Sequence, residues 1–387
     1  MTAATGGRRP RLVHLTTTDM SLDWLLGPQL RAFAAAGYEV IGMSAPGPHV
    51  EALRAAGIDH VALSAFTRST DVRSDLRGIR QLSAALRTTA PDILHTHNPK
   101  PGVLGRIVGR VRRIPLIVNT QHGLYAQPDD PPRRRWPVYA VEGLAGRLSH
   151  VELVQNEEDV TTLVETLHVP ADRVRHLGNG VDLGRFDPGT VDAATRLNVR
   201  AGWGVTDEVV CLSVGRLVRE KGITELLEAA HRLRLGGSSV RLVVVGPLDL
   251  GKHDAVDDST IAAAAADGVV FTGTRTDMPE CYAAAELFVT ASWREGMPRA
   301  AMEASAMGLP IVATDIRGNR QVVADGETGL VVPVRSADGL AGAMGRLATD
   351  DDLRRRYGAA ARERAVVEFD QQRVIDRTLD AYRLLRR

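Results

Sequence analysis

The chain has 387 residues, of which 44% are hydrophobic, 25% charged and 4% aromatic. At about 150 residues per domain, this length predicts two globular domains, and the apolar content excludes disordered and fibrous classes. Lys and Arg total 48 against 47 Asp and Glu, so no net charge attracts the protein to nucleic acid. The scarcity of aromatic residues also argues against a base-stacking surface.

The two cysteines, Cys211 and Cys281, lie in apolar stretches and are expected to be small buried residues in a reducing compartment. Residues 1–11 are small, polar and basic, and the apolar stretch 12–15 is too short for a signal peptide. No run approaches the roughly 18 apolar residues of a membrane span. We therefore expect a cytoplasmic protein.

Clustered basic residues leave contact with the inner face of a membrane open. They are Arg106, Arg110, Arg112 and Arg113, followed by the segment 133–136. Such charges can meet anionic lipid, but a solvated helix face is the simpler interpretation.

Short apolar runs alternate with longer helical patterns, as in parallel sheets with crossover helices. In the first half we expect strands at 11–15, 39–45, 92–97, 116–120 and 151–155, and helices at 22–36, 75–88, 103–111 and 136–148. In the second half we expect strands at 209–214, 240–245, 269–271, 287–290 and 311–313, and a last helix at 371–385. Near-continuous Val, Leu and Ile runs indicate strands covered on both faces.

Gly, Asn, Asp and Pro cluster between residues 177 and 189, as they do at linkers. We expect an N-terminal domain over 1–185, a C-terminal domain over 186–368, and a helix over 369–387 that packs back on the N-terminal domain. The predicted fold class is α/β, with two doubly wound domains facing each other across a cleft. Ligands of such sheets bind at the carboxyl ends of the strands.

Two carboxylates bracket a helix start after the strand 287–290. Glu295 lies in the loop with Gly296 and Met297, Pro298 suits the first turn of the helix, and Glu303 lies inside it. Carboxylates accept hydrogen bonds from vicinal hydroxyls, so the pair could hold a ribose and a sugar while backbone N–H groups meet phosphate. A solvated Glu303 and a Glu295 that stabilises the helix start explain the spacing equally well.

A second segment places cations where a strand ends and a helix begins. Gly215 ends the strand 209–214, Arg216 follows it, and Lys221 precedes a helix that starts near residue 223. Cations held there could clamp a diphosphate and stabilise it as a leaving group. Gly273 and Arg275 end another strand of this half, where the backbone could meet a nucleobase or form an ordinary turn.

In the first half, polar residues also follow the strands. His122 comes after the strand 116–120 and could hydrogen-bond a sugar or phosphate, although a structural role is as simple. His97 and Lys100 follow the apolar strand residues 92–94 and are expected at the same face of the sheet end. Thr17, Thr18 and Asp19 join the first strand to the first helix, where they could hold an acceptor or cap the helix.

We expect no metal and no cofactor. The sequence has no phosphate-binding Walker loop, no Gly-x-Gly-x-x-Gly and no His-Glu-x-x-His. Asp350, Asp351 and Asp352 read as a helix cap or solvated turn, and His95 with His97 offers a metal no third ligand. Arg216 and Lys221 would therefore supply the positive charge.

The second half resembles the retaining glycosyltransferases of family 4, which have the GT-B fold of two Rossmann-like domains. The resemblance rests on motifs in a specific order: Val214-Gly215-Arg216 with Lys221-Gly222, Phe271-Thr272-Gly273, Glu295 to Glu303, Ala313-Thr314-Asp315, and Asp325 to Leu330. Asn179 to Asp182 lies where the family places its interdomain junction.

The first half resembles a branch that builds capsular, exopolysaccharide or O-antigen units on polyprenyl-diphosphate carriers. The matching stretches are Leu15 to Leu22, His95 to Lys100 with Gly102, and Thr120 to Leu124. Many family members have paired glycines after the first strand, where this chain has Thr17-Thr18-Asp19.

The resemblance implies that the first domain is the acceptor side and the second binds the nucleotide sugar. Arg216 and Lys221 would hold the diphosphate, Glu303 the ribose and Glu295 the transferred sugar. His122 would line the donor sugar from the opposite domain. Such enzymes are metal-independent and retain anomeric configuration, with front-face attack in which the leaving phosphate helps to deprotonate the acceptor hydroxyl.

The sequence thus predicts a retaining glycosyltransferase that moves a hexose or N-acetylhexosamine from a UDP-sugar to a lipid-linked saccharide. The same chemistry on a soluble acceptor, such as a natural product or aminocyclitol, is one alternative. A non-catalytic nucleotide-sugar-binding protein is another, and a GT-B epimerase is a minor one.

Overall fold

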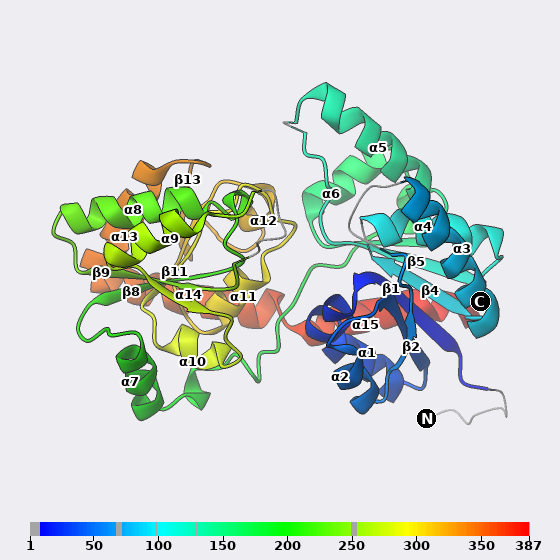
Figure 1. Ribbon diagram of the computed structural model, residues 1–387, viewed down its shortest axis with the longest axis horizontal. Helices are drawn as coiled ribbons and strands as arrows, with labels where there is room; N and C mark the ends of the chain where they lie inside the picture. Colours follow the sequence, from blue (N-terminus) through cyan, green and yellow to red (C-terminus); the bar gives the residue numbers. More distant parts are fainter. Residues whose placement is uncertain (1–7, 67–71, 98, 129, 249–253, 387) are drawn as a thin grey trace. The chain divides into compact units, whose positions relative to one another are not determined.

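The structure is a computed structural model that describes residues 8–66, 72–97, 99–128, 130–248 and 254–386. Asn98 and residues 1–7 of the basic N-terminus lie outside the described residues. The chain divides into two compact units, one formed by Met1–Gly178 with Val374–Arg387 and the other by Asn179–Arg373 (Figure 1). Each unit is an α/β layer structure around one parallel sheet.

The first unit contains a seven-stranded sheet in the order β3-β2-β1-β4-β5-β6-β7, with all neighbours parallel. Its strands are β1 (Arg11–Thr18), β2 (Glu39–Ala45), β3 (Asp59–Ala62), β4 (Ile93–His97), β5 (Leu116–Gln121), β6 (Val151–Val154) and β7 (Val174–His176). Its helical elements are η1 (Ser21–Leu25), α1 (Gly27–Ala35), α2 (Val50–Ala55), α3 (Val72–Thr89), α4 (Lys100–Val111), α5 (Pro132–Gly146), α6 (Glu157–Thr161), η2 (Thr162–Thr166), η3 (Ala171–Arg173), α15 (Gln371–Tyr382) and η6 (Arg383–Arg386).

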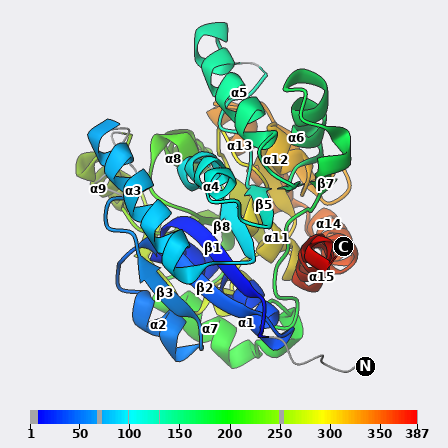
Figure 2. The same cartoon turned by 90° about the vertical axis from the view of Figure 1, so that its right-hand side faces the viewer.

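Strand alternation sends neighbouring residues of this sheet to opposite cores. Leu12 of β1 packs in a cluster with residues of α1 and α15, whereas Val13 packs in a cluster with residues of α3 and α4. Both views show the sheet between these helices, with α3 and α4 on one side and α1 on the other (Figures 1 and 2). His14 therefore faces the α15 side of the sheet.

The second unit contains a six-stranded sheet in the order β10-β9-β8-β11-β12-β13, again parallel throughout. Its strands are β8 (Val209–Val214), β9 (Val240–Val245), β10 (Val270–Gly273), β11 (Leu287–Thr290), β12 (Ile311–Thr314) and β13 (Gly329–Val332). Its helical elements are η4 (Pro188–Thr190), α7 (Ala193–Gly202), η5 (Arg219–Lys221), α8 (Ile223–Leu235), α9 (Asp258–Ala266), α10 (Met278–Ala283), α11 (Arg299–Ala306), α12 (Arg317–Arg320), α13 (Ala337–Thr349) and α14 (Asp351–Glu368).

The chain passes from the first unit to the second after Gly178, earlier than the boundary at 185 that the linker composition indicates. The backbone N–H of Val181 donates to Phe369 O at 2.8 Å, and Phe186 is buried in a core of the second unit. These contacts attach the glycine-rich segment to the second unit. Val374, Ile375 and Tyr382 of α15 pack in the core of the first unit.

Several expected elements differ in detail. Strand β1 continues to Thr18, so Thr17 and Thr18 belong to a strand and not to the connecting loop. The expected first helix is two elements, η1 and α1, that meet at Gly27 and Pro28. In the second unit, Asp350 caps α14 by accepting from the N–H of Leu353 at 2.9 Å, which confirms the cap interpretation. Within the described residues, no helix has the length and apolar character needed to cross a bilayer.

Candidate active site

Three strands of the second sheet end in glycines that lie against one another. The N–H of Gly215 donates to Val245 O and that of Gly246 to Gly273 O, both at 2.9 Å. A Cβ on Gly246 would lie 1.8 Å from Gly215 O, so no larger residue fits there. The carboxyl ends of β8, β9 and β10 are thus followed by Gly215, Gly246 and Gly273 in strand order, and Arg216, directly after Gly215, is half-buried.

Lys221 and Glu295, 74 residues apart in sequence, are in contact at this end of the sheet through Nζ and Oε1. Gly222 follows Lys221 with φ of 68°, and a Cβ there would lie 2.0 Å from Ala291 O. This close approach of the η5 turn to the end of β11 places Lys221 beside Glu295. Ser292 Oγ also donates to Glu295 Oε1 at 3.0 Å, so a lysine and a hydroxyl orient one carboxylate.

The loop Glu295–Pro298 is held from two sides. A Cβ on Gly318 would lie 2.6 Å from Glu295 O, so α12 packs directly on the loop backbone. Asn179 Nδ2 donates to Met297 O at 3.2 Å. Helix α11 begins at Arg299, and Pro298, with ψ of 115°, precedes it instead of occupying its first turn. Because its ψ angle is extended and not helical, Pro298 is the last residue of the loop.

Glu303 is not the solvated helix residue that its position would also allow. Its side chain is 13% exposed and accepts from Tyr282 Oη at 3.0 Å and from Arg299 Nε at 3.1 Å. Burial raises the pKa of Glu303, although Arg299 and the Tyr282 hydrogen bond act in the opposite direction. These two contacts fix the orientation of the Glu303 carboxylate on α11, the helix that follows the loop carrying Glu295.

Arg275 lies beyond Gly273 but points to an acidic neighbour. Its Nε donates to Asp277 Oδ1 at 2.8 Å, and this hydrogen bond raises the pKa of Arg275. Arg185 reaches the same loop, where its NH2 donates to Thr276 O at 3.1 Å, and its charge also acts on Glu303. Arg275 therefore stabilises the loop after β10, with its guanidinium paired.

In the first unit, His122 follows β5 and its Nε2 lies 2.9 Å from His97 Nδ1. Burial lowers the pKa of His122 to about 4, with a hydrogen bond from Gln155 acting in the opposite direction. Lys100 contacts Asp75 of α3. Asp19 accepts from the backbone N–H of Met20 at 2.9 Å and of His49 at 2.8 Å, so both of its oxygens are engaged in local structure.

The basic cluster of α4 is only partly a surface feature, contrary to the expectation from sequence. Arg106 is fully buried and contacts Glu142 and Glu152, each at 2.8 Å. Arg110 donates to Leu148 O and is half-buried. Arg112 and Arg113 are exposed, as are Arg133 and Arg134 of α5.

Sequence reasoning missed the residues that hold the candidate site in place. These are Ser292, Tyr282, Arg299 and Arg185 in the second unit, and His14 and Tyr382 in the first. Arg299 stands four residues before Glu303 on α11, a helical spacing that places the two side chains within reach. Ser292 stands three residues before Glu295 in a loop, where spacing alone does not indicate a contact. Nothing local in the sequence indicates Tyr282 or Tyr382.

Residues 197–364 match the family described as Glycosyl transferases group 1, and residues 29–185 match Glycosyltransferase Family 4. A D-inositol 3-phosphate glycosyltransferase of Saccharomonospora viridis is 31% identical over 330 residues, covering 78% of this chain and 73% of the relative. The chain belongs to glycosyltransferase family 4. This is a family of retaining enzymes, and the two sheets are those of its GT-B fold.

A second relative of this family 4 glycosyltransferase is the UDP-Gal:alpha-D-GlcNAc-diphosphoundecaprenol alpha-1,3-galactosyltransferase of Escherichia coli. It is 27% identical over 322 residues, which is 81% of each chain. Among solved structures, Anabaena Alr3699/HepE in complex with UDP and glucose has a TM-score of 0.80 at 18% identity, covering 96% of this chain and 98% of that one. The structural likeness extends over both units.

Proposed function

We propose that the protein transfers a hexose or N-acetylhexosamine from a UDP-sugar to a lipid-linked saccharide during assembly of a cell-surface polysaccharide. The observation that carries this proposal is the contact of Lys221 with Glu295 at the strand edge that also presents Arg216. The Escherichia coli relative is named for UDP-Gal and a diphosphoundecaprenol acceptor, and the Anabaena structure is titled with UDP and glucose. Both names support a UDP-sugar as the donor.

In this proposal the two cations take the diphosphate and the two carboxylates take the sugars. Arg216 offers a planar fork and Lys221 a mobile point charge, so together they stabilise the negative charge that develops on the leaving diphosphate without a metal. When the donor binds, Lys221 would leave Glu295 and contact the phosphate. Ser292 would keep the Glu295 carboxylate oriented toward a sugar hydroxyl. Glu303, held by Tyr282 and Arg299, would accept from the ribose hydroxyls.

We propose fewer acceptor-binding residues than the sequence indicates. His122 hydrogen-bonds a sugar, and Thr17 and Thr18 remain the acceptor-binding candidates, because His97 is buried and both of its ring nitrogens have hydrogen-bond partners. Asp19 and Lys100 are engaged in structural contacts with their neighbours, so they are not needed for acceptor binding. Attack by the acceptor hydroxyl from the leaving-group face, with its proton passing to the leaving phosphate, accounts for retention without a covalent nucleophile.

Calorimetry with UDP, GDP, ADP and dTDP tests the donor part directly. We expect UDP to bind equally well with Mg²⁺ and with EDTA, and Arg216→Ala to weaken binding by about tenfold or more, because a charge-assisted contact to phosphate is lost. Arg219→Ala, an exposed arginine three positions further along, is the matched control and should bind UDP within about twofold of wild type. The proposal would be contradicted if binding required Mg²⁺ or if none of the four nucleotides bound.

A lipid-linked acceptor requires access to a membrane, and α5 presents a suitable surface. Its exposed residues include Arg133 and Arg134 in the first turn, then Trp136 at 52%, Val141 at 50% and Leu144 at 64% exposure. A basic first turn followed by an exposed apolar stripe fits insertion at an anionic interface. We propose that this surface binds the inner face of the cell membrane.

Flotation with phosphatidylglycerol-containing vesicles tests the membrane contact. The double variant Arg133→Glu and Arg134→Glu should lose binding by about tenfold or more, because each cation near an anionic surface contributes about 1 kcal/mol. Arg355→Glu with Arg356→Glu, exposed on α14, makes the same change of charge in the second unit and should leave flotation unchanged. Wild-type protein that stays with the soluble fraction while it glycosylates a soluble sugar would favour the soluble-acceptor alternative.

A further inference from the structure

Behind His122, a row of histidines fills one face of the first sheet. His14 of β1 is aligned with His95 of β4, and His97 of β4 with Thr120 of β5. Because neighbours in parallel register point to the same face, all four side chains lie on the α15 side, where Tyr382 meets them. None of these residues is more than 4% exposed, so no water competes for their polar atoms.

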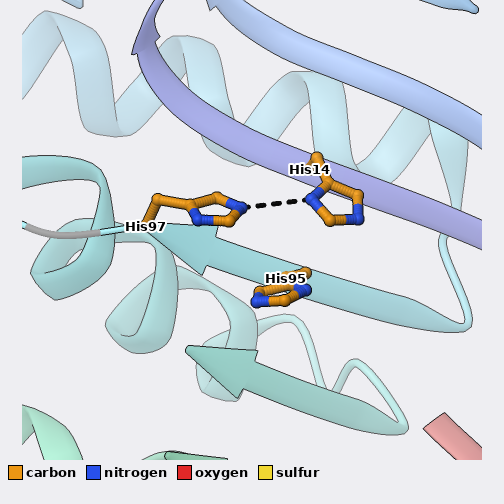
Figure 3. Close-up of side chains that lie close together, drawn as sticks. All are labelled: His14, His95 and His97. Carbon is orange, nitrogen blue, oxygen red and sulfur yellow. Dashed lines mark hydrogen bonds between the residues drawn. The ribbon is translucent and has the colours of Figure 1, made fainter. Parts of the chain in front are cut away.

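These side chains form one continuous chain of hydrogen bonds that ends at His122. Thr120 Oγ1 lies 2.7 Å from His95 Nε2, and His95 Nδ1 lies 2.5 Å from Tyr382 Oη. Tyr382 Oη lies 3.1 Å from His14 Nε2. His14 Nδ1 lies 3.1 Å from His97 Nε2 (Figure 3). His97 Nδ1 then lies 2.9 Å from His122 Nε2.

The rings are neutral, so each must donate from one nitrogen and accept at the other. Burial lowers the pKa of His14 to about 3 and that of His122 to about 4, and the pKa values of His95 and His97 lie well below the usual range for the same reason. A chain of such groups has only two consistent arrangements, one the reverse of the other. Whichever is adopted decides which nitrogen of His122 carries the proton.

The Thr120 end of the chain fixes its direction. Among the described residues, His95 is the partner of the Thr120 hydroxyl, so that buried O–H is satisfied only if it donates to His95 Nε2. Each following group then accepts from the one before it and donates to the next, so His97 Nδ1 donates to His122 Nε2. With Nε2 occupied by His97, the proton that His122 donates is on Nδ1.

We infer that Thr120, His95, Tyr382, His14 and His97 are positioning residues that hold His122 as its Nδ1–H tautomer. His122 is thereby a neutral hydrogen-bond donor whose Nδ1–H can be offered to a sugar hydroxyl, and its Nε2 is closed to proton abstraction. All four rings carry their proton on Nδ1 in this arrangement. The catalytic role of His122 rests on the proposed function, whereas the assignment of its tautomer does not.

The same nitrogens argue against a metal site in this cluster, although His14 adds the third histidine that the sequence does not indicate. Both ring nitrogens of His14, His95 and His97 already have hydrogen-bond partners. The His95 and His97 rings stack with centroids 4.6 Å apart and planes 16° apart, so their in-plane lone pairs run side by side and do not converge.

Long-range ¹H–¹⁵N correlation spectra of ¹⁵N-histidine-labelled protein read the tautomers without any substrate. We expect Nδ1-protonated signals for all four rings, assigned through single histidine variants. In Tyr382→Phe the chain is interrupted, so His122 should gain an Nε2-protonated population. Tyr38→Phe, which changes a ring packed against Tyr382 without breaking the chain, should leave the signals unchanged. An Nε2-protonated His122 in wild type, an unchanged His122 in Tyr382→Phe, or one zinc ion bound by all three inner rings would overturn the inference.

A kinetic measurement separates this inference from the proposed function. Tyr382→Phe should lower kcat about threefold to tenfold with little change in the KM for the donor, since the chain that fixes the tautomer of His122 is interrupted. If His122 changes tautomer and turnover does not fall, the chain stands and the catalytic role of His122 fails. If UDP does not bind while the tautomers are as expected, the proposed donor fails and the chain again stands.

Discussion

Arg106→Met is expected to lower the free energy of unfolding of the first unit by about 3–5 kcal/mol, because it leaves two carboxylates buried without their cation. Arg106 has no exposed surface, and its three donor nitrogens bond Gly102 O, Glu142 and Glu152, each at 2.8 Å. Asn119 and Ser149 complete the shell around Glu152. No rearrangement within this shell can replace the lost charge.

The pH dependence of that loss gives a second, independent check. Burial raises the pKa of Glu152, and Arg106 opposes this, so removal of Arg106 raises it further. A carboxyl with a raised folded-state pKa favours the folded state below that pKa and destabilises it as the pH rises. The difference between variant and wild type in urea unfolding should therefore be smaller at pH 5.5 than at pH 8.

Arg112→Met on the exposed end of α4 is the control for this experiment and should stay within about 0.5 kcal/mol of wild type. A loss below about 1 kcal/mol for Arg106→Met would contradict the buried ion network. It would mean that water reaches Glu142 and Glu152 when the guanidinium is gone.

The second large effect is acid instability confined to the first unit. The pKa of His14 falls from 6.5 to about 3 through burial, and those of His95 and His97 also lie well below 6.5. A histidine with a depressed folded-state pKa contributes stability that is complete above pH 6.5 and is lost as the pH falls toward the folded-state value. For His14 alone the loss is about 2 kcal/mol at pH 5 relative to neutral pH.

The second unit should resist the same change of pH. Its shifted groups include Glu208 and Asp257, whose pKa values hydrogen bonds lower to about 2, so their contribution is lost only below the usual carboxylate range. Methionine-methyl NMR during urea unfolding at pH 7.5, 6 and 5 distinguishes the units, because Met43 lies in a core of the first and Met302 and Met344 in cores of the second. Equal loss at all three probes, or none at Met43, would contradict the expectation.

Near-continuous apolar runs predict most of this fold because the central strands are buried on both faces. The strands 39–45, 209–214, 240–245 and 287–290 occur where expected. The missed strands β3, β7 and β13 all lie at sheet edges. Strands β3 and β7 read Asp-His-Val-Ala and Val-Arg-His, which contain no continuous apolar run, and β13 reads Gly-Leu-Val-Val, an apolar run too short to stand out from a loop. Parallel strands end at one edge, so the approach of Lys221 to Glu295 also follows from sequence order.

Contacts that depend on a distant element could not be predicted. Arg106 reads as one more basic residue on a helix, because only the folded chain brings Glu142 and Glu152 against it. Tyr382 lies 287 residues from His95 and 368 from His14. Their meeting requires α15 to return to the first sheet, and even then no local motif indicates that a tyrosine will join the histidine row.

The return of α15 has a consequence for synthesis on the ribosome. Every residue of the second unit lies between Asn179 and Arg373, so this unit can complete its fold as soon as that stretch has emerged. The first unit cannot, since Val374–Arg387 supplies part of its core and is translated after the whole second unit. The usual order, in which the amino-terminal domain matures first, is thus reversed, and a message truncated directly after codon 373 would yield a finished second unit tethered to an unfinished first one.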